Sequence, residues 1–343
     1  MTDELNDSCD VVVIGGGAAG LNGALMLARA RRSVVVIDAG APRNAPADGV
    51  HGLLGREGMP PAELLERGRA EVRGYGGRVV TGEVTGAIRE DDAFLLELAD
   101  GRTVRSRRLL VTTGLVDELP DVAGLRERWG RDVVHCPYCH GWEVRDRPIG
   151  VIANGPMSVH GALLFRQWSD DIILFTHTMD APTGEAAEKL AARGITVIGG
   201  PVAALEITDD HISGVRLADG TVVPRAVVTV GPRMVARSEI LRKLGVEAVD
   251  HPSGAGVYVP TDAMGRTEVP GVWAAGNITD LSAQVGAAAA AGAFAAAQIN
   301  ADLVEEETRQ AVADHRRGFS RAAEAEVSNQ VLGERRHGLS DNR

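Results

Sequence analysis

The sequence predicts an α/β protein of two domains, each built around a parallel β-sheet. The chain has 343 residues, a length at which a single hydrophobic core is no longer expected. Residues 10–38 follow the order strand, glycine turn, helix, strand, and the same order begins again at Pro148. Glycine is abundant, at 42 residues, as many tight turns require. We therefore expect two units of the strand–helix–strand type.

Composition and charge are typical of a soluble, acidic protein. Apolar residues make up 44% of the chain and the mean hydropathy is −0.03, which leaves no surplus for burial in a membrane. The formal net charge of −11 argues against nucleic-acid binding, which depends on Lys and Arg at the phosphates. The first residues are acidic where a secretory signal is positive, so we expect a cytoplasmic location. The alanine-rich run 284–300 is short for a membrane span and predicts a packed core helix.

The first unit carries a dinucleotide-binding pattern. Its strand ends in VVVIGGGAAG, where Gly15, Gly17 and Gly20 complete G-x-G-x-x-G, and Asp38 ends the next strand. The first glycine permits the tight turn, the second lets the backbone approach a pyrophosphate, and the third lets the helix pack against the strand. The helix N-terminus offers free N–H groups to the phosphates, and the Asp38 carboxylate can accept hydrogen bonds from a ribose diol. The complete context predicts dinucleotide binding.

The remaining elements follow from alternation and turn residues. In the first half of the chain we expect a helix at 61–75, strands at 78–88, 93–98, 103–105 and 109–114, and a linker at 115–124. The second unit continues with the strands DIILFTH and GITVIGG, a hairpin-like stretch and the strand AVVTVG, to about Gly245. The final block has a short strand and glycine turn at 269–280, then the alanine-rich helix, and beyond Asp302 a charged tail.

The stretch HCPYCHGWE, residues 135–143, places two cysteines beside two histidines. The spelling C-x-x-C-H is that of haem attachment, Cys and His together can hold zinc, and C-P-Y-C is also a redox spelling. The chain has three cysteines, and Cys9 is far from Cys136 and Cys139 in sequence. In a reducing cytosol, a close pair is more often catalytic or metal-binding than a structural disulfide.

The order of these motifs resembles the low-molecular-weight thioredoxin reductase family. The order is the first dinucleotide unit, VTTG before a linker, C-x-x-C inside the second unit, and PGVWAAGN before a helix of small residues. The resemblance implies two Rossmann-like, three-layer domains, the second inserted in the first, and a homodimer. It places a discontinuous FAD-binding domain at 1–117 and 248–303, an inserted NAD(P)-type domain with the dithiol at 118–247, and a charged tail at 304–343.

The same resemblance assigns residues to FAD. It places the cofactor against Gly15, Gly17, Gly20, Asp38, Gly276, Asn277, Gln284 and Val285. Asn277 departs from the family, which usually has Asp after the glycine of this second motif, and Asn can still form hydrogen bonds without the charge. Gln284 and Val285 match positions that approach the isoalloxazine ring.

The resemblance also favours one interpretation of the cysteine pair. Haem attachment normally accompanies export, for which the sequence carries no signal. A zinc site would have to take its four ligands from Cys136, Cys139, His135 and His140, which are too close in sequence for good tetrahedral geometry. We therefore expect a flavin-coupled dithiol of Cys136 and Cys139 and no metal.

Two departures weaken the expected NADPH site. The second dinucleotide turn, Ala153 to Ser158, keeps only Gly155 of the glycine pattern, and Pro156 removes an N–H that could face phosphate. After the next strand, the run 175–180 reads FTHTMD, without the basic cluster that holds a 2′-phosphate. NADPH binding is therefore doubtful, and the use of NADH or of a variant pose stays open.

A flavoprotein of this kind resembles the FAD-dependent dithiol oxidases that close disulfides in natural products of the gliotoxin and holomycin type. In that group the active site also contains C-x-x-C-H, and electrons pass from a substrate dithiol to the enzyme disulfide, to FAD and to O2. The resemblance implies that substrate attacks Cys136 and that Cys139 passes the electron pair to the flavin. His140 replaces an acid and can take protons from incoming thiols, although a purely structural histidine is the alternative.

Three functions follow from these observations. The first is an O2-using oxidase of a small-molecule dithiol. The second is a reductase of thioredoxin or a small disulfide, fed by NAD(P)H or another electron donor. The third, from a different class, is a non-catalytic flavin-bound redox sensor or partner-binding protein.

Overall fold

The computed structural model describes residues 4–5, 7–155, 157–318 and 321–332. The chain divides into two compact units, Met1–Ala297 and Gln298–Arg343. The first unit contains four β-sheets and all the residues of the site described below. Each unit is described by itself.

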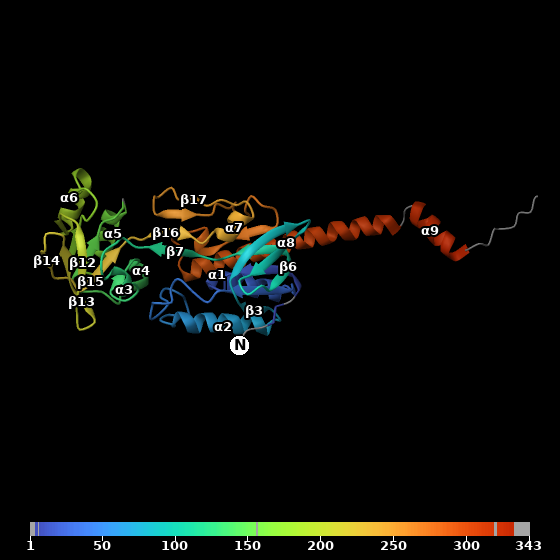
Figure 1. Ribbon diagram of the computed structural model, residues 1–343, viewed down its shortest axis with the longest axis horizontal. Helices are drawn as coiled ribbons and strands as arrows, with labels where there is room; N and C mark the ends of the chain where they lie inside the picture. Colours follow the sequence, from blue (N-terminus) through green and yellow to red (C-terminus); the bar gives the residue numbers. More distant parts are fainter. Residues whose placement is uncertain (1–3, 6, 156, 319–320, 333–343) are drawn as a thin grey trace, which may run out of the picture. The chain divides into compact units, whose positions relative to one another are not determined.

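The first sheet has seven strands, in the order β3-β2-β1-β6-β5-β4, with β19 paired to the C-terminal half of β6. Figure 1 labels β3 and β6 of this sheet. Strands β3, β2, β1, β6 and β19 are parallel, whereas β5 and β4 are antiparallel. The strands are β1 (Ser8–Ile14), β2 (Val34–Asp38), β3 (Arg78–Thr81), β4 (Val84–Glu90), β5 (Ala93–Leu98), β6 (Thr103–Val111) and β19 (Val272–Ala274). Buried Val, Ile and Leu side chains of β1, β2 and β6 form its core, as expected for parallel strands covered on both faces.

One expectation about β6 was wrong. The two strands expected at 103–105 and 109–114 form one continuous strand, which ends at Val111. The polar run between them, 106–108, looks like a loop in the sequence. Ser106 is nevertheless 1% exposed, and its hydroxyl accepts the N–H of Val12 on β1 at 2.8 Å. A buried polar side chain that is hydrogen-bonded to the neighbouring strand is compatible with the sheet.

Helices α1 (Ala18–Arg29), α2 (Pro61–Gly74) and α8 (Val285–Gly318) belong to the first domain's pattern, and α8 continues into the second unit. The start of α8 packs closely on α1, since a Cβ on Gly292 would lie 1.9 Å from the Ala19 carbonyl oxygen. The Asn22 side-chain amide also donates to the Ala289 carbonyl oxygen at 2.8 Å. By length and composition alone, Val285–Arg316 can cross a membrane, a test that core helices of soluble proteins also pass. The close contact with α1 accounts for its small residues.

The second parallel sheet has five strands in the order β11-β10-β9-β15-β8, and an antiparallel sheet, β12-β13-β14, follows it. Their strands are β8 (Val133–Val134), β9 (Ile149–Ile152), β10 (Ile172–Phe175), β11 (Thr196–Ile198), β12 (Val202–Thr208), β13 (His211–Leu217), β14 (Val222–Val223) and β15 (Val227–Val230). The helices in this part of the chain are α3 (Leu125–Arg128), α4 (Pro137–His140), α5 (Ser158–Phe165) and α6 (Gly184–Ala192). Two parallel sheets with interleaved helices confirm the predicted α/β class.

The segment expected as a linker is partly a strand. Strand β7 (Leu115–Glu118) pairs antiparallel with β16 (Arg233–Ala236), in a four-stranded sheet completed by β17 (Val249–Asp250) and β18 (Gly256–Tyr258). Helix α7 (Glu239–Lys243) follows β16, and its Ile240 and Leu241 lie in the core of the first sheet. Helix α7 thus packs on the first sheet. The domain boundaries, including the one at 247, stay a prediction.

The second unit contains the rest of α8 and helix α9 (Arg321–Leu332). Exposed charged residues on α8 pair at helical spacing, as in Arg309 with Glu305 at 3.2 Å. Side chains of this kind fit the charged tail expected from the sequence.

Candidate active site

A cavity of about 1600 Å³ contains the site. It is larger than the roughly 300–1000 Å³ of common small-molecule pockets, as an extended dinucleotide requires. Its lining includes nine of the eleven residues predicted for cofactor binding or catalysis, namely Gly15, Gly17, Asp38, Asn277, Gln284, Val285, Cys136, Cys139 and His140. Gly20 and Gly276 lie outside the lining, and their neighbours show that they act through packing.

The first glycine turn fits a pyrophosphate. Gly15 has φ +103, and a Cβ there would lie 2.6 Å from the Thr112 carbonyl oxygen. A Cβ on Gly20 would lie 1.9 Å from the Gly15 carbonyl oxygen, so only glycine allows α1 this close to the turn. At Gly17 a Cβ would meet no protein atom within 4 Å, although the residue lines the cavity. That free space beside the α1 N-terminus is what a bound pyrophosphate needs.

Asp38 and Asn277 supply polar groups to the same cavity. The Asp38 carboxylate accepts a hydrogen bond from the Arg69 guanidinium at 3.1 Å, and its other lone pairs can accept hydrogen bonds from a ribose diol. Asn277 lies in a 3₁₀ turn, η1 (Gly276–Ile278), and its side-chain NH2 donates to the carbonyl oxygens of Asp280 and Ala283 at 3.0 and 2.9 Å. An aspartate cannot donate these bonds, so the departure seen in the sequence has a structural reason.

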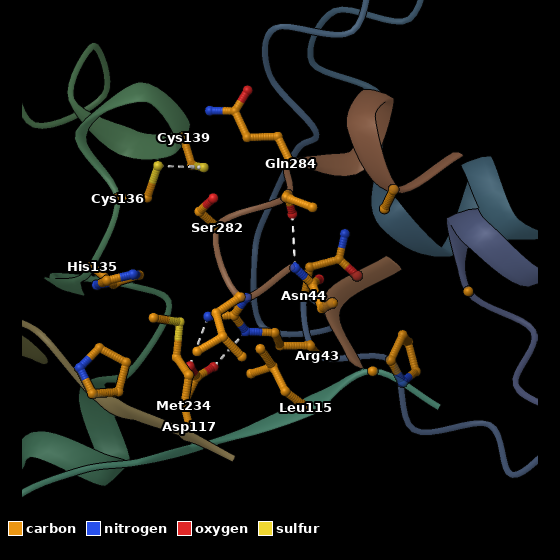
Figure 2. Close-up of a pocket in the computed structure, with 18 of the residues that line it drawn as sticks. Arg43, Asn44, Leu115, Asp117, His135, Cys136, Cys139, Met234, Ser282 and Gln284 are labelled. Atoms are coloured by element: carbon orange, nitrogen blue, oxygen red, sulfur yellow. Dashed lines mark hydrogen bonds and ion pairs between the residues drawn. The ribbon is translucent and has the colours of Figure 1, made fainter. Parts of the chain in front are cut away.

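Cys136 immediately precedes α4, and Cys139 is the third residue of this helix. The Cys139 thiol donates to the Cys136 sulfur across 2.8 Å, and Figure 2 shows the pair facing the side chain of Gln284. The hydrogen bond from Cys139, with backbone N–H groups and Gln284 assisting, lowers the pKa of Cys136 to about 6. The same bond and burial raise the pKa of Cys139. The reduced pair therefore holds one proton, on Cys139, and presents Cys136 as the thiolate, the reactive form of cysteine.

His140 ends α4 and lines the cavity beside the dithiol. Both of its ring nitrogens are buried without a hydrogen-bond partner among the described residues. Burial lowers its pKa, with a smaller opposing effect from Glu143 and a lowering one from His51. A neutral imidazole with a free nitrogen is able to accept a proton from a thiol. His135 also has a lowered pKa, caused by burial and then by Arg43.

Sequence reasoning missed a charged pair next to the dithiol. Arg43 and Asp117 form a bidentate ion pair, with both distances 2.7 Å, and Asp117 is largely buried (Figure 2). The positive charge of Arg43 also lowers the pKa of Cys139, against the larger raising effects. The two residues are 74 positions apart. A signal could have come from Arg43 in the loop after the ribose-binding strand, but no sequence pattern links it to β7.

In the second dinucleotide turn, a side chain of the turn occupies the backbone N–H groups that would otherwise bind a phosphate. The N–H groups of Asn154 and Gly155 donate to the Ser158 hydroxyl oxygen at 3.2 and 3.3 Å. Ser158 takes the last position of the glycine pattern, where a small apolar residue would leave these N–H groups to a phosphate. Pro156, which the sequence also singled out, lies outside the described residues. Sequence reasoning noted the lost glycine and missed the role of Ser158.

In the segment after β10, the histidine side chain is likewise engaged by a hydrogen bond within the protein. His177 has φ +52, and its Nδ1 accepts the Val202 N–H at 3.1 Å. Burial lowers the pKa of His177, which favours the neutral ring. The one imidazole in this stretch is thus held by the backbone and offers no positive charge to a 2′-phosphate.

Comparison with known proteins identifies the family. The chain matches the family described as pyridine nucleotide-disulphide oxidoreductase over residues 9–297. The protein belongs to this family. Thioredoxin reductase tcpT of Claviceps purpurea is 31% identical over 316 residues, covering 86% of this chain and 95% of the relative. Thioredoxin reductase sirT of Leptosphaeria maculans is 28% identical over 309 residues, covering 85% of this chain and 93% of the relative.

Solved structures agree with this assignment. HlmI superposes with a TM-score of 0.85 at 48% identity, covering 93% of this chain and 100% of HlmI. TrxB of Bacillus anthracis, a putative thioredoxin reductase, superposes with a TM-score of 0.81 at 29% identity, covering 87% of this chain and 99% of TrxB. This pyridine nucleotide-disulphide oxidoreductase is therefore a thioredoxin reductase-like enzyme that binds FAD, and its fold confirms the expected pair of Rossmann-like domains.

Proposed function

We propose that this flavoenzyme is a dithiol oxidase that forms a disulfide in a small-molecule substrate, with O2 as the final electron acceptor. The observation that carries the proposal is the second dinucleotide turn, whose N–H groups are taken by Ser158. A phosphate there would have to displace an internal hydrogen bond, and the run 176–183 directly after β10 contains no Lys or Arg to pair with it. An enzyme with a working dithiol and an occupied second dinucleotide turn can take its electrons from a thiol substrate.

The dithiol pair supports that direction of flow. A substrate thiolate attacks the Cys136 sulfur, the Cys136–Cys139 disulfide breaks, and Cys139 takes the electron pair. The second substrate thiolate then attacks the first substrate sulfur and releases Cys136, whose lowered pKa makes it a good leaving group. FAD, when bound by the first turn, supplies the acceptor for the two electrons. His140 holds a free ring nitrogen beside the pair and takes a substrate proton.

A second candidate, a disulfide reductase, has its own support. Several similar proteins are named thioredoxin reductases, among them those of Aquifex aeolicus and Listeria monocytogenes at 26% and 23% identity. In that function NADH or NADPH reduces the flavin, and electrons leave through Cys136 to a disulfide. The closed second turn predicts that neither nucleotide does so.

Anaerobic reduction tests the proposal directly. The purified yellow protein is mixed without O2 with dithiothreitol, NADPH or NADH, and the flavin absorbance is followed. We expect bleaching by the dithiol alone, and return of the colour with one H2O2 per flavin when air is admitted. Rapid bleaching by a nicotinamide would instead identify a disulfide reductase. Bound FAD with no reduction by any of the three would favour the redox sensor.

A homodimer, which the family resemblance implies, and a cytoplasmic location, expected from the acidic first residues, complete the proposal. Light scattering of the full chain should give about twice its 36.0 kDa. A mass of one chain would remove the dimer and leave the chemistry unaffected.

A further inference from the structure

A hairpin, residues 50–59, places His51 at the dithiol cavity. Its ends are joined by an antiparallel bridge, in which the Val50 N–H donates to the Met59 carbonyl oxygen at 2.8 Å. His51 lines the same cavity as Cys136 and His140. The loop also approaches the segment before α8, since a Cβ on Gly52 would lie 3.9 Å from the Gln284 side-chain oxygen. The sequence offered no motif for this loop.

The orientation of the His51 ring is fixed by Glu57. His51 Nδ1 is 2.7 Å from one Glu57 carboxylate oxygen, and the other oxygen accepts the Gly52 N–H at 2.9 Å. A carboxylate on Nδ1 favours the tautomer with its proton on that nitrogen, which leaves Nε2 to take up and release a second proton. Nε2 points towards Glu143, 3.6 Å from a carboxylate oxygen. This is the histidine–carboxylate arrangement of a general base.

His51 and His140 differ in their access to water. His140 has both ring nitrogens buried, whereas the His51 side chain is 23% exposed and its partner Glu57 66% exposed. The two rings interact electrostatically, because the charge of His51 contributes to the lowered pKa of His140. Glu143 is three residues after His140, and its carboxylate lies 3.6 Å from His51 Nε2. Its charge also raises the pKa of His140, against the larger lowering effect of burial, so Glu143 interacts with both imidazoles.

Proton balance requires such an exit. A substrate dithiol brings two thiol protons, and disulfide exchange converts the Cys136–Cys139 disulfide to a dithiol while the substrate becomes a disulfide. Because the pKa of Cys136 is lowered to about 6 and that of Cys139 is raised, the reduced pair keeps one proton at neutral pH, on the Cys139 thiol that donates to Cys136. In the anaerobic half-reaction one proton is therefore set free, and a proton is taken up again when O2 becomes H2O2. Because both ring nitrogens of His140 are buried, exchange of this proton with water needs a second, more exposed group.

We propose that His51, oriented by Glu57, is the proton exit of the dithiol site, taking the proton that His140 or the substrate gives up and passing it to solvent. The inference rests on the proposed function. The groups that face this route are Glu57, Glu143, His140 and Asp48. His51 acts on the proton and leaves sulfur and flavin chemistry to Cys136 and Cys139.

Anaerobic stopped-flow reduction by dithiothreitol tests this assignment. In His51→Ala we expect flavin reduction about 10-fold slower or more, with release of one proton to an indicator dye slowed equally and the FAD content unchanged. Added imidazole should restore the rate, because it replaces the missing base. The Glu57→Gln variant keeps His51 but alters its orientation. Its rate of flavin reduction should lie between those of wild type and His51→Ala. His211→Gln is the matched control, since this exposed histidine bonds only its own turn, at the Asp209 carbonyl oxygen.

The outcomes separate the two proposals. A His51→Ala protein reduced at the wild-type rate would overturn this inference and leave the oxidase standing. Slow reduction that imidazole does not restore, together with lost FAD, would also overturn it by showing a structural role. Wild-type protein that no dithiol reduces would overturn both.

Discussion

The two glycine turns of this protein, residues 15–20 and 153–158, share a spacing and differ in what fills them. In the first, a Cβ at Gly17 would meet no protein atom, and the N-terminus of α1 is free for a phosphate. In the second, the Ser158 hydroxyl already accepts two of the N–H groups. A dinucleotide fold can thus survive the loss of its ligand when one side chain satisfies the backbone donors that the ligand would otherwise satisfy. The predictions below follow from this difference.

The largest effect should come from Gly20→Ala. The new Cβ would lie 1.9 Å from the Gly15 carbonyl oxygen, so the turn or α1 must move. We expect colourless protein, and a loss of stability at or above the upper end of the roughly 1–3 kcal/mol typical of overpacking. Gly155→Ala is the matched control, because a Cβ there meets nothing within 4 Å. Flavin absorbance and thermal melts measure both, and equal effects of the two variants would break the comparison.

His140→Ala should reduce dithiol oxidation by about 100-fold while FAD stays bound. Burial lowers the pKa of His140, so the neutral base is present throughout the neutral range and is lost only as the pH falls below the usual 6.5. Wild-type activity should therefore fall on the acid side below that value, and the variant should lack this component. Peroxide production between pH 5 and 8 gives the profile, and an unchanged profile would leave His140 a structural role.

Alkylation of Cys136 should change about tenfold between pH 8 and pH 5. Its lowered pKa, about 6, means that the thiolate is present above that value and is protonated below it. By the same sign, the thiolate stabilises the reduced protein above the ordinary thiol pKa, and this contribution is lost as pH falls through about 6. Iodoacetamide labelling of reduced protein, read by mass spectrometry, checks the midpoint. A midpoint near 9 would mean that Cys139 does not donate to Cys136.

The smallest effect is expected for Ser158→Ala. Removing the hydroxyl frees two N–H groups at a partly exposed turn, at a cost of about 1 kcal/mol in stability. NADH should then protect the protein against heat slightly more than it protects wild type, since the donors are available to phosphate. Protection of wild type by NADH at the same level would show that Ser158 does not close the turn.

Much of the fold was predictable because its signals are local. The glycine turn at 15–20, the strand before it and Asp38 lie within one short run, and each has a physical requirement that the residue type reveals. Strand β6 was harder, since Ser106 is buried through a hydrogen bond to Val12 that no periodicity predicts. Strand β7 was expected as a linker because its partner, β16, is distant in sequence.

The candidate site divides in the same way. Cys136, Cys139 and His140 belong to one short C-x-x-C-H motif, so they could be predicted as site residues from the sequence. Arg43, His51 and Ser158 came only from the structure, because each contributes through a partner on another segment or through the hydrogen bonds of one turn. Asn277 was noted as a departure, but its reason, two donated hydrogen bonds, required the geometry of η1.

The buried cysteine at the start of β1 gives the protein its own indicator of unfolding. Cys9 is 8% exposed, and burial raises its pKa to about 12, so a thiol reagent has neither access nor thiolate. Titration of the native protein should therefore count two thiols when the enzyme is reduced and none when it is oxidised. A third thiol should become reactive only when the first sheet opens. One colorimetric assay thus reports the redox state of the site and the integrity of the fold as separate numbers.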